Sequence, residues 1–276
     1  MTMFRIAIIF ILNCLVSVAP AVPSALDDFH KKFDLLVSSY VRKEPGAGLL
    51  GRTFLRRAIR YQELVKSTDW QNYIAELAYV DEAVIKAAAP AAGKAFWLNT
   101  FNALVIDSVG RATPPLKAAP RNDVEFWKSL HNVAGKKYSL EQIRARIYEF
   151  QDPRVVFAMT EASAGSPSLP EKAFTATNVE RQLDEAVRNI ASDPSFVRLV
   201  RGQNTLFLAE IFQFESIALT MPYWRVSQPY RNYPPEARSV VMLIEPYFTD
   251  AERKFLAGGK VQIKYTPYLT NLNTVR

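Results

Sequence analysis

The sequence has very few residues of the types that bind metals or cross-link chains. Its 276 residues include one cysteine, Cys14, and two histidines, His30 and His131. Cys14 lies in a segment that we expect to be removed, so the mature chain would have no disulfide, no thiolate ligand and no cysteine nucleophile. The two histidines are far apart and no carboxylates are spaced around them as a ligand set. We therefore predict no metal and no other cofactor.

A hydrophobic run long enough to cross a bilayer is also absent. Residues 6–18, IAIIFILNCLVSV, form an apolar run of 13 residues, whereas a spanning helix needs about 20. Arg5 precedes this run and the small residues APAVPSA follow it, which is the pattern of a secretory signal peptide. We expect residues 1–21 to be removed, with cleavage after Ala25 as the alternative. The protein would then be exported to a periplasm or to the extracellular space, without a membrane span.

The excess of positive charge is too small and too dispersed to predict nucleic-acid binding. The formal net charge is +7. Basic residues cluster at 52–60 and at 136–146, but acidic residues lie near both clusters and no aromatic residues alternate with them. A solvated surface explains such clusters better than a nucleic-acid groove does.

The most apolar stretch of the mature chain is AFWLNTFNALVI at 95–106. Its large side chains surround the whole circumference of a helix, which predicts a buried central helix at about 91–110. Asn99 and Asn102 lie three residues apart and face nearly the same side of that helix. They either hold neighbouring loops through hydrogen bonds to the backbone or position a reacting group.

The remaining pattern predicts one α+β domain over residues 26–276, with a helical N-terminal half and a small antiparallel sheet mainly from the C-terminal half. Apolar periodicity predicts helices at 26–43, 68–88, 123–130, 139–150, 178–191 and 235–247. Hairpins are expected at 131–140 and 196–208. Strands are expected at 154–159, RVVFAM, and in the tail at 259–268.

The loop SAGSPSLP at 163–170 follows the expected strand 154–159 and is the best candidate for chemistry, because a rigid strand positions such a loop well. Ser166 is a candidate nucleophile, but a serine needs a base within hydrogen-bond reach. Glu161 is the acidic candidate for that base, and neither histidine adjoins the loop. Thr160 and Ser163 are the other two candidate residues in or directly before this loop.

Five segments in this order resemble the family catalogued as domain of unknown function 547: AFWLNTFNAL, VAGKKYSLEQI, DPRVVFAM, SAGSPSLP and VQIKYTPYLTNLN. The resemblance covers roughly Leu26 to Asn273. It implies a thiol-dependent site, because the family pattern has a Cys-Pro-Pro-Leu loop, histidines before it and a Tyr-Asp-Trp motif near the end. No activity is established for the family as a class.

The resemblance implies that other residue types stand at the positions of the family's reactive groups. The cysteine corresponds to Ser166 and one histidine to Val156. The other histidine corresponds to Ala145, with Arg144 in place of the acid before it. The late aspartate corresponds to Leu269 and the tryptophan to Thr270. The family's remaining pattern is retained at Asn99, Asn102, Asp152, Pro153, Arg154, Tyr268, Leu272 and Asn273.

We therefore expect a catalytically inactive, exported binding module whose ligand is an unidentified peptide, protein or small molecule. The first alternative is a hydrolase or acyl-transfer enzyme in which Ser166 attacks, with Glu161, a lysine or His131 as the base. The second is an envelope protein that binds a partner through MPYWRVSQPYRNY at 221–233, although tyrosines in such a loop often just cover a core. The sequence alone does not give the oligomeric state.

Overall fold

Helix α5 (Pro90–Arg111) lies at the centre of the larger of two hydrophobic clusters. The computed structural model describes residues 25–47, 53–223 and 230–275, and the expected signal peptide lies outside these ranges. Every residue of α5 from Ala92 to Asp107 is buried, which confirms the predicted central helix. Pro90 at its first turn fits a position where a backbone N–H would have no helical partner.

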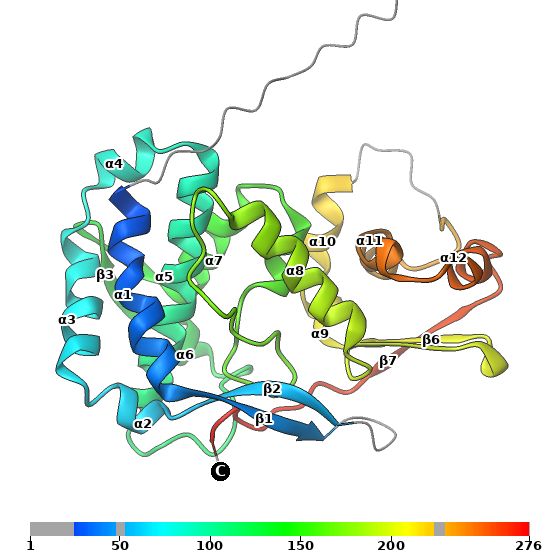
Figure 1. Ribbon diagram of the computed structural model, residues 1–276, viewed down its shortest axis with the longest axis horizontal. Coiled ribbons are helices and arrows are strands. Elements are labelled where there is room, and N and C mark those ends of the chain that lie inside the picture. Colours follow the sequence, from blue (N-terminus) through cyan, green and yellow to red (C-terminus); the bar gives the residue numbers. More distant parts are fainter. Residues whose placement is uncertain (1–24, 48–52, 224–229, 276) are drawn as a thin grey trace, which may run out of the picture.

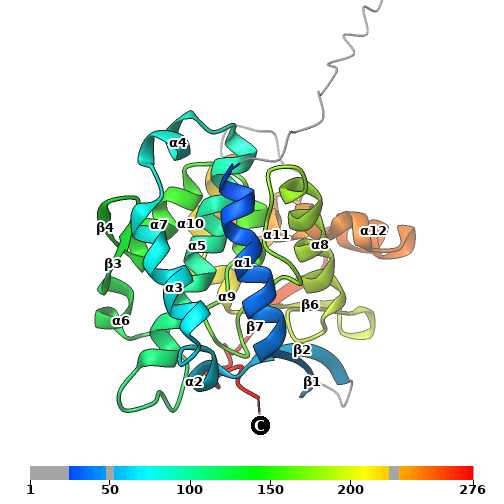
Figure 2. The same cartoon turned by 60° about the vertical axis from the view of Figure 1, so that its left-hand side comes forward.

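Six shorter helices surround or adjoin α5 (Figures 1 and 2). Two of them begin at serine caps: Ser67 accepts from the backbone N–H of Trp70, and Ser139 and Gln142 form the predicted capping box. The helices are α1 (Ala25–Tyr40), α2 (Tyr61–Leu64), α3 (Thr68–Glu76), α4 (Glu82–Ala87), α6 (Val124–Lys128) and α7 (Leu140–Tyr148).

The first predicted helix ends earlier than expected, and a hairpin follows it. Strand β1 (Val41–Ala47) pairs antiparallel with β2 (Thr53–Ile59). Pro45 disfavours a helix that continues up to it, and the ladder to β2 supplies the backbone with other partners. The predicted helix at 68–88 is likewise divided, because Asp81 caps a new helix by accepting from the amide of Ala83 at 2.7 Å.

The prediction of a strand at 154–159 was wrong. Pro153–Phe157 form a 3-10 helix, η3, whose N-cap is Asp152. Short apolar runs fit a buried strand and a buried helical turn equally well. Pro153 at the first helical position and Asp152 as the N-cap favour the helical turn over a strand.

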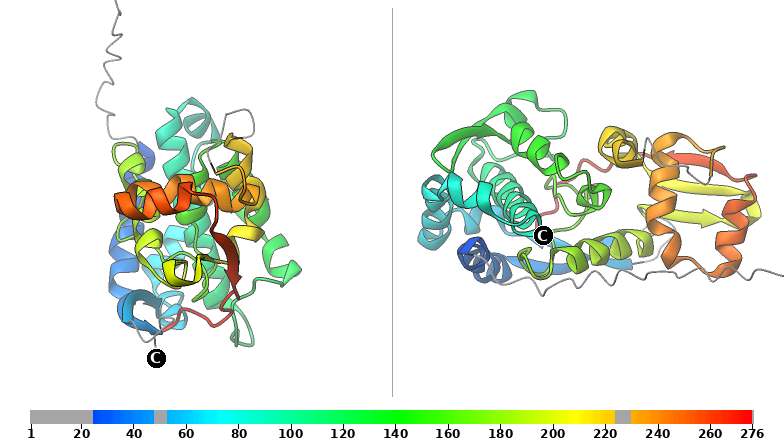
Figure 3. Two further views of the ribbon diagram at one scale, coloured as in Figure 1. Left: turned by 90° about the vertical axis from the view of Figure 1, so that its right-hand side faces the viewer. Right: turned by 90° about the horizontal axis from the view of Figure 1, so that it is seen from above.

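The second hydrophobic cluster lies between a three-stranded sheet and the helices of the C-terminal half (Figure 3). The sheet has the order β5–β6–β7; β5 and β6 are antiparallel, whereas β6 and β7 are parallel. The α+β class is confirmed, with this sheet mixed rather than antiparallel. Its strands are β5 (Val197–Val200), β6 (Thr205–Ala209) and β7 (Gln262–Thr266). The helices are α8 (Val179–Ser192), α9 (Ile211–Phe214), α10 (Ser216–Thr220), α11 (Pro235–Ile244) and α12 (Asp250–Ala257).

The candidate loop lies where the two clusters meet. Val155 of η3 belongs to the first cluster, and Val156 and Phe157 belong to the second. The predicted hairpin of β3 (Leu130–Val133) and β4 (Lys136–Ser139) is confirmed on the side of the first cluster. In the described part of the chain, no helix is both long and apolar enough to span a bilayer.

The chain after β7 returns to the first cluster and fixes the candidate loop from outside (Figure 1). The backbone N–H of Ala164 donates to the carbonyl of Asn271 at 2.8 Å, and that of Asn273 donates to Ala162 at 3.1 Å. The N–H of Ile59, at the end of β2, donates to the carbonyl of Asn273 at 2.9 Å. The tail therefore connects β2 with the loop at 162–164.

Candidate functional site

The hydroxyl of Ser166 is bonded to the backbone of its own loop. Its Oγ accepts from the N–H of Glu161 at 3.1 Å and from that of Ser163 at 3.4 Å, and it donates to the carbonyl of Ser163 at 3.0 Å. Ser166 is 3 % exposed. Its hydrogen-bonding capacity is used to hold a turn, and none of these three bonds goes to a side-chain base.

Glu161 is held by two arginines and a tyrosine. One carboxylate oxygen accepts from Nη1 of Arg121 and, at 2.9 Å, from the hydroxyl of Tyr268. The other accepts from Nη2 of Arg144 at 3.1 Å. Both carboxylate oxygens of Glu161 are therefore engaged by side-chain donors.

A second carboxylate, Glu215, completes the arrangement. It accepts from Nη1 of Arg144 at 3.4 Å and from the hydroxyl of Tyr148, and it lies 3.9 Å from Nη2 of Arg121. We call these six side chains the charged cluster: Arg121, Arg144, Tyr148, Glu161, Glu215 and Tyr268. It contains two anions, two cations and two phenols, so its formal charge is zero.

Aromatic rings support both arginines of the charged cluster. The guanidinium carbon of Arg144 lies 4.5 Å from the ring centre of Trp127, and that of Arg121 lies 4.1 Å from the ring centre of Phe214. Cation–π contacts of this kind stabilise a partly desolvated cation. Burial alone would lower the pKa of Arg144. The negative charges of Glu161 and Glu215 have the larger effect together, so the pKa of Arg144 is raised.

The phenols of the charged cluster act as hydrogen-bond donors. Burial raises the pKa of Tyr148 well above its ordinary value, and the neighbouring Glu215 raises it further. Burial, followed by the charge of Glu161, raises the pKa of Tyr268. Both phenols stay protonated at neutral pH, and neither is a candidate for a tyrosinate base.

A small pocket remains beside the charged cluster. It is lined by Arg144, Val156, Met159, Glu161, Ile211 and Glu215, and it has room for about one water molecule. A substrate of ordinary size does not fit without a rearrangement.

The three positions that correspond to lost family groups lie in different surroundings. Val156 is buried and lines the pocket. Ala145 is exposed on α7, and Leu269 is 42 % exposed. The backbone of Leu269 is used instead: its carbonyl accepts from the N–H of Gly165 at 2.9 Å and from the hydroxyl of Ser163. A Cβ on Gly165 would lie 2.6 Å from the nitrogen of Leu269, so this close approach requires glycine.

Asn99 and Asn102 are fully buried, and both hold loops through the backbone. Asn99 exchanges two hydrogen bonds with Phe174, at 2.8 and 2.9 Å. Asn102 donates to the carbonyl of Ala158 at 3.0 Å and accepts from the N–H of Thr160 at 2.9 Å. Asn102 therefore fixes the backbone directly before Glu161. The hydroxyl of Thr160 accepts from Ala162 at 3.3 Å within the same turn.

Asp152 and Arg154 belong to a separate ionic network. Asp152 accepts from Nζ of Lys94 at 2.7 Å and from Nε of Arg154 at 2.9 Å. Burial opposes the charge of Asp152, but these two bonds outweigh it and lower its pKa. Arg154 also pairs with Glu180 and Asp184 of α8. The network ties η3 to α5 and α8.

The last retained family residues also have structural contacts. Asn273 accepts a hydrogen bond from the buried hydroxyl of Tyr61, and its backbone joins β2 to the loop as described above. Leu272 forms an isolated bridge with Ser163. Tyr268 is the one tail residue whose side chain enters the charged cluster.

The two histidines bond to other partners. Nδ1 of His30 lies 2.8 Å from the hydroxyl of Tyr73 in a buried aromatic environment, and Nε2 of His131 lies 3.2 Å from Oγ of Ser129. Burial lowers the pKa of His30 to about 3 and also lowers that of His131. No group of three or more His, Cys, Asp or Glu side chains within the described ranges is arranged to hold a metal ion.

The aromatic segment 221–233 is described only in part, because residues 224–229 lie outside the described ranges. Tyr233 is buried and donates to the carbonyl of Leu256 at 2.7 Å. Tyr230 stacks on it with ring centres 5.7 Å apart. These two tyrosines cover the second hydrophobic cluster.

Residues 86–189 match the model of the family described as Protein of unknown function, DUF547. The match supports the resemblance to this family, and we call residues 86–189 the DUF547 segment. The DUF547 segment contains Arg121, Arg144, Glu161 and Ser166, whereas Glu215 and Tyr268 follow it in the chain. Searches of curated proteins and of solved structures gave no match.

Sequence reasoning found Glu161 and Tyr268 but gave no role to Tyr148 or Glu215. A sequence pattern points to these two residues only when the helices that contain or adjoin them are known. Tyr148 lies four residues after Arg144 on α7, so the two share a face. Glu215 lies four residues after Ile211 and four before Leu219, both buried. A charged residue in an apolar stripe indicates a buried partner. Which partner it is depends on long-range packing.

Replacing Glu161 tests the energetic role of the charged cluster. Glu161→Gln removes one of the two carboxylates that face the partly buried guanidinium groups of Arg121 and Arg144, so the free energy of unfolding should fall by about 3 kcal/mol. Glu185→Gln is the matched control, because it breaks the exposed pair with Arg181 and should cost less than about 0.5 kcal/mol. Unfolding in urea measures the loss of free energy of unfolding in both variants. Equal losses in the two variants would show that the charged cluster does not stabilise the fold.

Burial of His30 predicts a pH dependence of stability. Because its pKa is about 3 in the fold and about 6.5 in the unfolded chain, protonation favours unfolding. Its contribution is complete above pH 6.5 and is lost as the pH falls toward 3, at up to about 1.4 kcal/mol per pH unit. The free energy of unfolding, measured in urea, should fall between pH 7 and pH 5. This fall should be about 2 kcal/mol smaller in His30→Gln than in the wild type. It should stay large in His131→Gln, and an unchanged difference in His30→Gln would refute the assignment.

Proposed function

We propose that this protein is an exported, catalytically inactive member of the DUF547 family that acts by binding. The observation that carries the proposal is the bonding of Ser166, whose hydroxyl is occupied by backbone groups at 3.0–3.4 Å. A serine nucleophile needs a base that takes its proton, and the residue at the family's histidine position is Val156. In hydrolases the loss of the nucleophile or the base alone lowers the rate by on the order of 10³ or more.

The charged cluster supports the same proposal. Glu161, the acidic candidate for the base, pairs with Arg121 and Arg144 and accepts a hydrogen bond from Tyr268. Arg144 stands where the family has an acid, so the charge at this position is reversed. The reversal creates an ion pair that holds α7 against the loop and leaves no acid–base pair for catalysis.

Exposed apolar side chains beside the charged cluster support a binding role. Phe214 ends α9 directly before Glu215, Ile217 lies in α10 and Met221 directly follows α10; their side chains are 47 %, 71 % and 56 % exposed. Large apolar side chains grouped on a surface mark contact sites more often than isolated ones do. Because the pocket itself holds about one water, a ligand of any size would contact the surface around it.

A serine-directed probe tests catalytic inactivity. A fluorophosphonate should label the wild-type protein no faster than it labels Ser166→Ala, because the hydroxyl has no base. Ser166→Ala should instead lose about 1–3 kcal/mol of stability, whereas Ser168→Ala, an exposed position in the same loop, should be close to neutral. Labelling that is fast in the wild type and absent only in Ser166→Ala would establish the alternative, a serine hydrolase or acyl transferase.

Export is tested by the N-terminus of the mature protein. When the full chain is expressed in a bacterium with a periplasm, the recovered protein should begin at Val22, or at Leu26 for the later cleavage site. Ile9→Arg places a charge inside the apolar run and should leave the chain uncleaved. Recovery of the wild-type protein from the cytoplasm with its first 21 residues intact would contradict export.

A further inference from the structure

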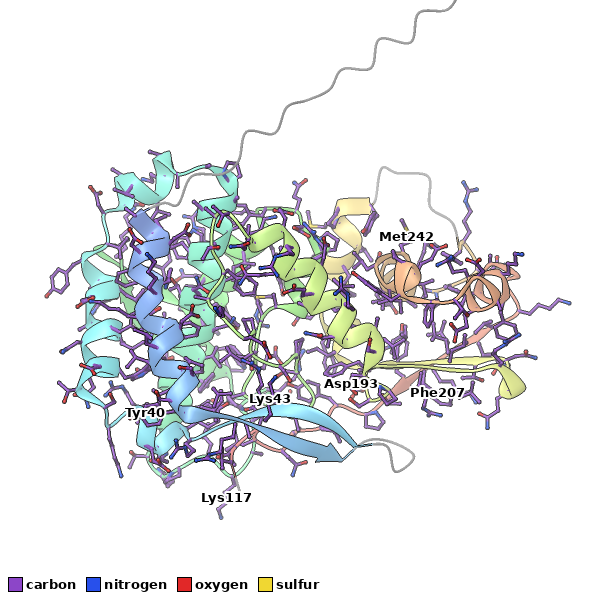
Figure 4. The ribbon with its side chains drawn as sticks, viewed as in Figure 1. Tyr40, Lys43, Lys117, Asp193, Phe207 and Met242 are labelled. Atoms are coloured by element: carbon purple, nitrogen blue, oxygen red, sulfur yellow. The ribbon has the colours of Figure 1, made fainter. Side chains whose placement is uncertain are left out.

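The β5–β6–β7 sheet has one covered face and one open face. Residues paired across the strands share a face. One set belongs to or packs against the second hydrophobic cluster: Val197, Leu199, Leu206, Leu208, Ile263 and Tyr265. The alternate set, Arg198, Val200, Thr205, Phe207, Gln262 and Lys264, faces the other way. On this second face, which we call the open face, Gln262 and Lys264 are exposed and Thr205 is buried, and the other three are partly buried. Figure 4 shows Phe207 on the side of the sheet opposite α11 and α12.

A basic row crosses the open face. Arg198 pairs with Phe207, and Phe207 pairs with Lys264. The guanidinium of Arg198 lies 4.1 Å from the ring centre of Phe207, and its Nε is buried without a partner. Lys264 is exposed. Within the described ranges, no carboxylate forms an ion pair with either cation. The open face therefore has positive charge to offer an anionic partner.

Strand β7 is an edge strand, and on one side its backbone groups have no partner among the described residues. The N–H of Gln262 donates to Asn204 at 2.8 Å and the carbonyl of Thr266 accepts from Glu210 at 2.9 Å; both partners flank β6. Backbone groups alternate in direction along a strand, so Ile263 and Tyr265 direct their N–H and C=O groups away from β6. No described strand pairs with that side of β7.

We propose that β7 binds an extended peptide of a partner protein in which acidic and apolar residues alternate, and that this peptide adds a fourth strand to the sheet. The outward N–H and C=O groups of Ile263 and Tyr265 would form the new ladder. Acidic side chains of the peptide would lie beside Lys264 on the open face. Its apolar side chains would lie beside Ile263 and Tyr265 on the covered face, where both are only partly buried.

Charge complementarity and the free edge together select this partner over other anions. A polyanion such as a sulfated glycan or a lipid surface would use the cations but not the backbone groups of β7. Single-stranded nucleic acid prefers several stacking rings, and the open face has Phe207 alone. The proposed edge is separate from the charged cluster, so it does not depend on the state of Ser166.

The test measures binding of a dye-labelled heptapeptide, Thr-Glu-Val-Glu-Val-Glu-Thr, to the full protein by fluorescence anisotropy. Lys264→Glu places like charges side by side and should weaken binding about fivefold or more. Lys117→Glu makes the same charge change at an exposed loop position away from the sheet (Figure 4) and should change affinity less than about twofold. The peptide with lysine in place of glutamate should not bind measurably.

A backbone variant separates strand addition from simple charge attraction. Ile263→Pro removes one outward donor, a change that edge strands tolerate, and should weaken binding about tenfold. Ile263→Ala shortens the side chain but keeps the N–H and should stay within about threefold of the wild type. If the proline variant does not fold, hydrogen exchange on the wild type replaces it, and the amides of Ile263 and Tyr265 should become protected when the peptide is added.

Three results would overturn the proposal. The first is equal effects of Lys264→Glu and Lys117→Glu. The second is binding that Ile263→Pro or exchange shows to be independent of the backbone. The third is a heparin fragment or a phosphatidylglycerol vesicle that binds through Lys264 while the heptapeptide does not, which would identify a charge-only surface.

Discussion

The two amides buried in α5 are the constraint on which the candidate site depends. A helix that is covered on all sides has no water to satisfy Asn99 and Asn102, and an unpaired amide there would cost roughly 1–3 kcal/mol. Each side chain finds both a donor and an acceptor in the backbone of a crossing segment. Two segments that are distant in the sequence, at 158–160 and at 174, are therefore fixed relative to the central helix. Glu161 follows directly after the first of them.

The charged cluster shows how a buried carboxylate is accommodated between α7, the loop and the tail. Isolated burial of Glu161 would be unfavourable, but Arg121, Arg144 and Tyr268 supply donors to both of its oxygens, and aromatic rings cover the arginines. Such a cluster contributes little net stability compared with apolar side chains of the same volume, yet removing one member leaves its partner unpaired. It specifies one arrangement of α7, the loop and the tail. That role is structural and requires no proton transfer.

Local sequence patterns predicted the fold well wherever a pattern extended over several turns. The central helix, the capping box at Ser139, the hairpin at 130–139 and helix α8 all have strong local signals. The RVVFAM segment did not, because five or six apolar residues fit a strand as well as a turn, and Pro153 with Asp152 favoured the turn. The hairpin of β1 and β2 was missed because its strands carry charged residues beside a helix with similar composition.

In the site, the spacing of Asn99 and Asn102 predicted their backbone-holding role as one of two alternatives. The meeting of Arg121, Arg144, Glu161 and Glu215 depends on contacts between distant segments, and no local pattern encodes it.

The return of the chain end to β2 has a consequence for how the molecule is made. Tyr61 and Asn273, which bond to each other, are 212 positions apart, and the loop that contains Ser166 is closed by Asn271 and Leu269. Contacts of such separation form late, because the intervening chain must first be ordered. The N-terminal helices can assemble on α5 before the segment after β7 takes its place. The turn around Ser166 therefore acquires its partners at Leu269 and Asn271 only after the rest of the fold has been ordered.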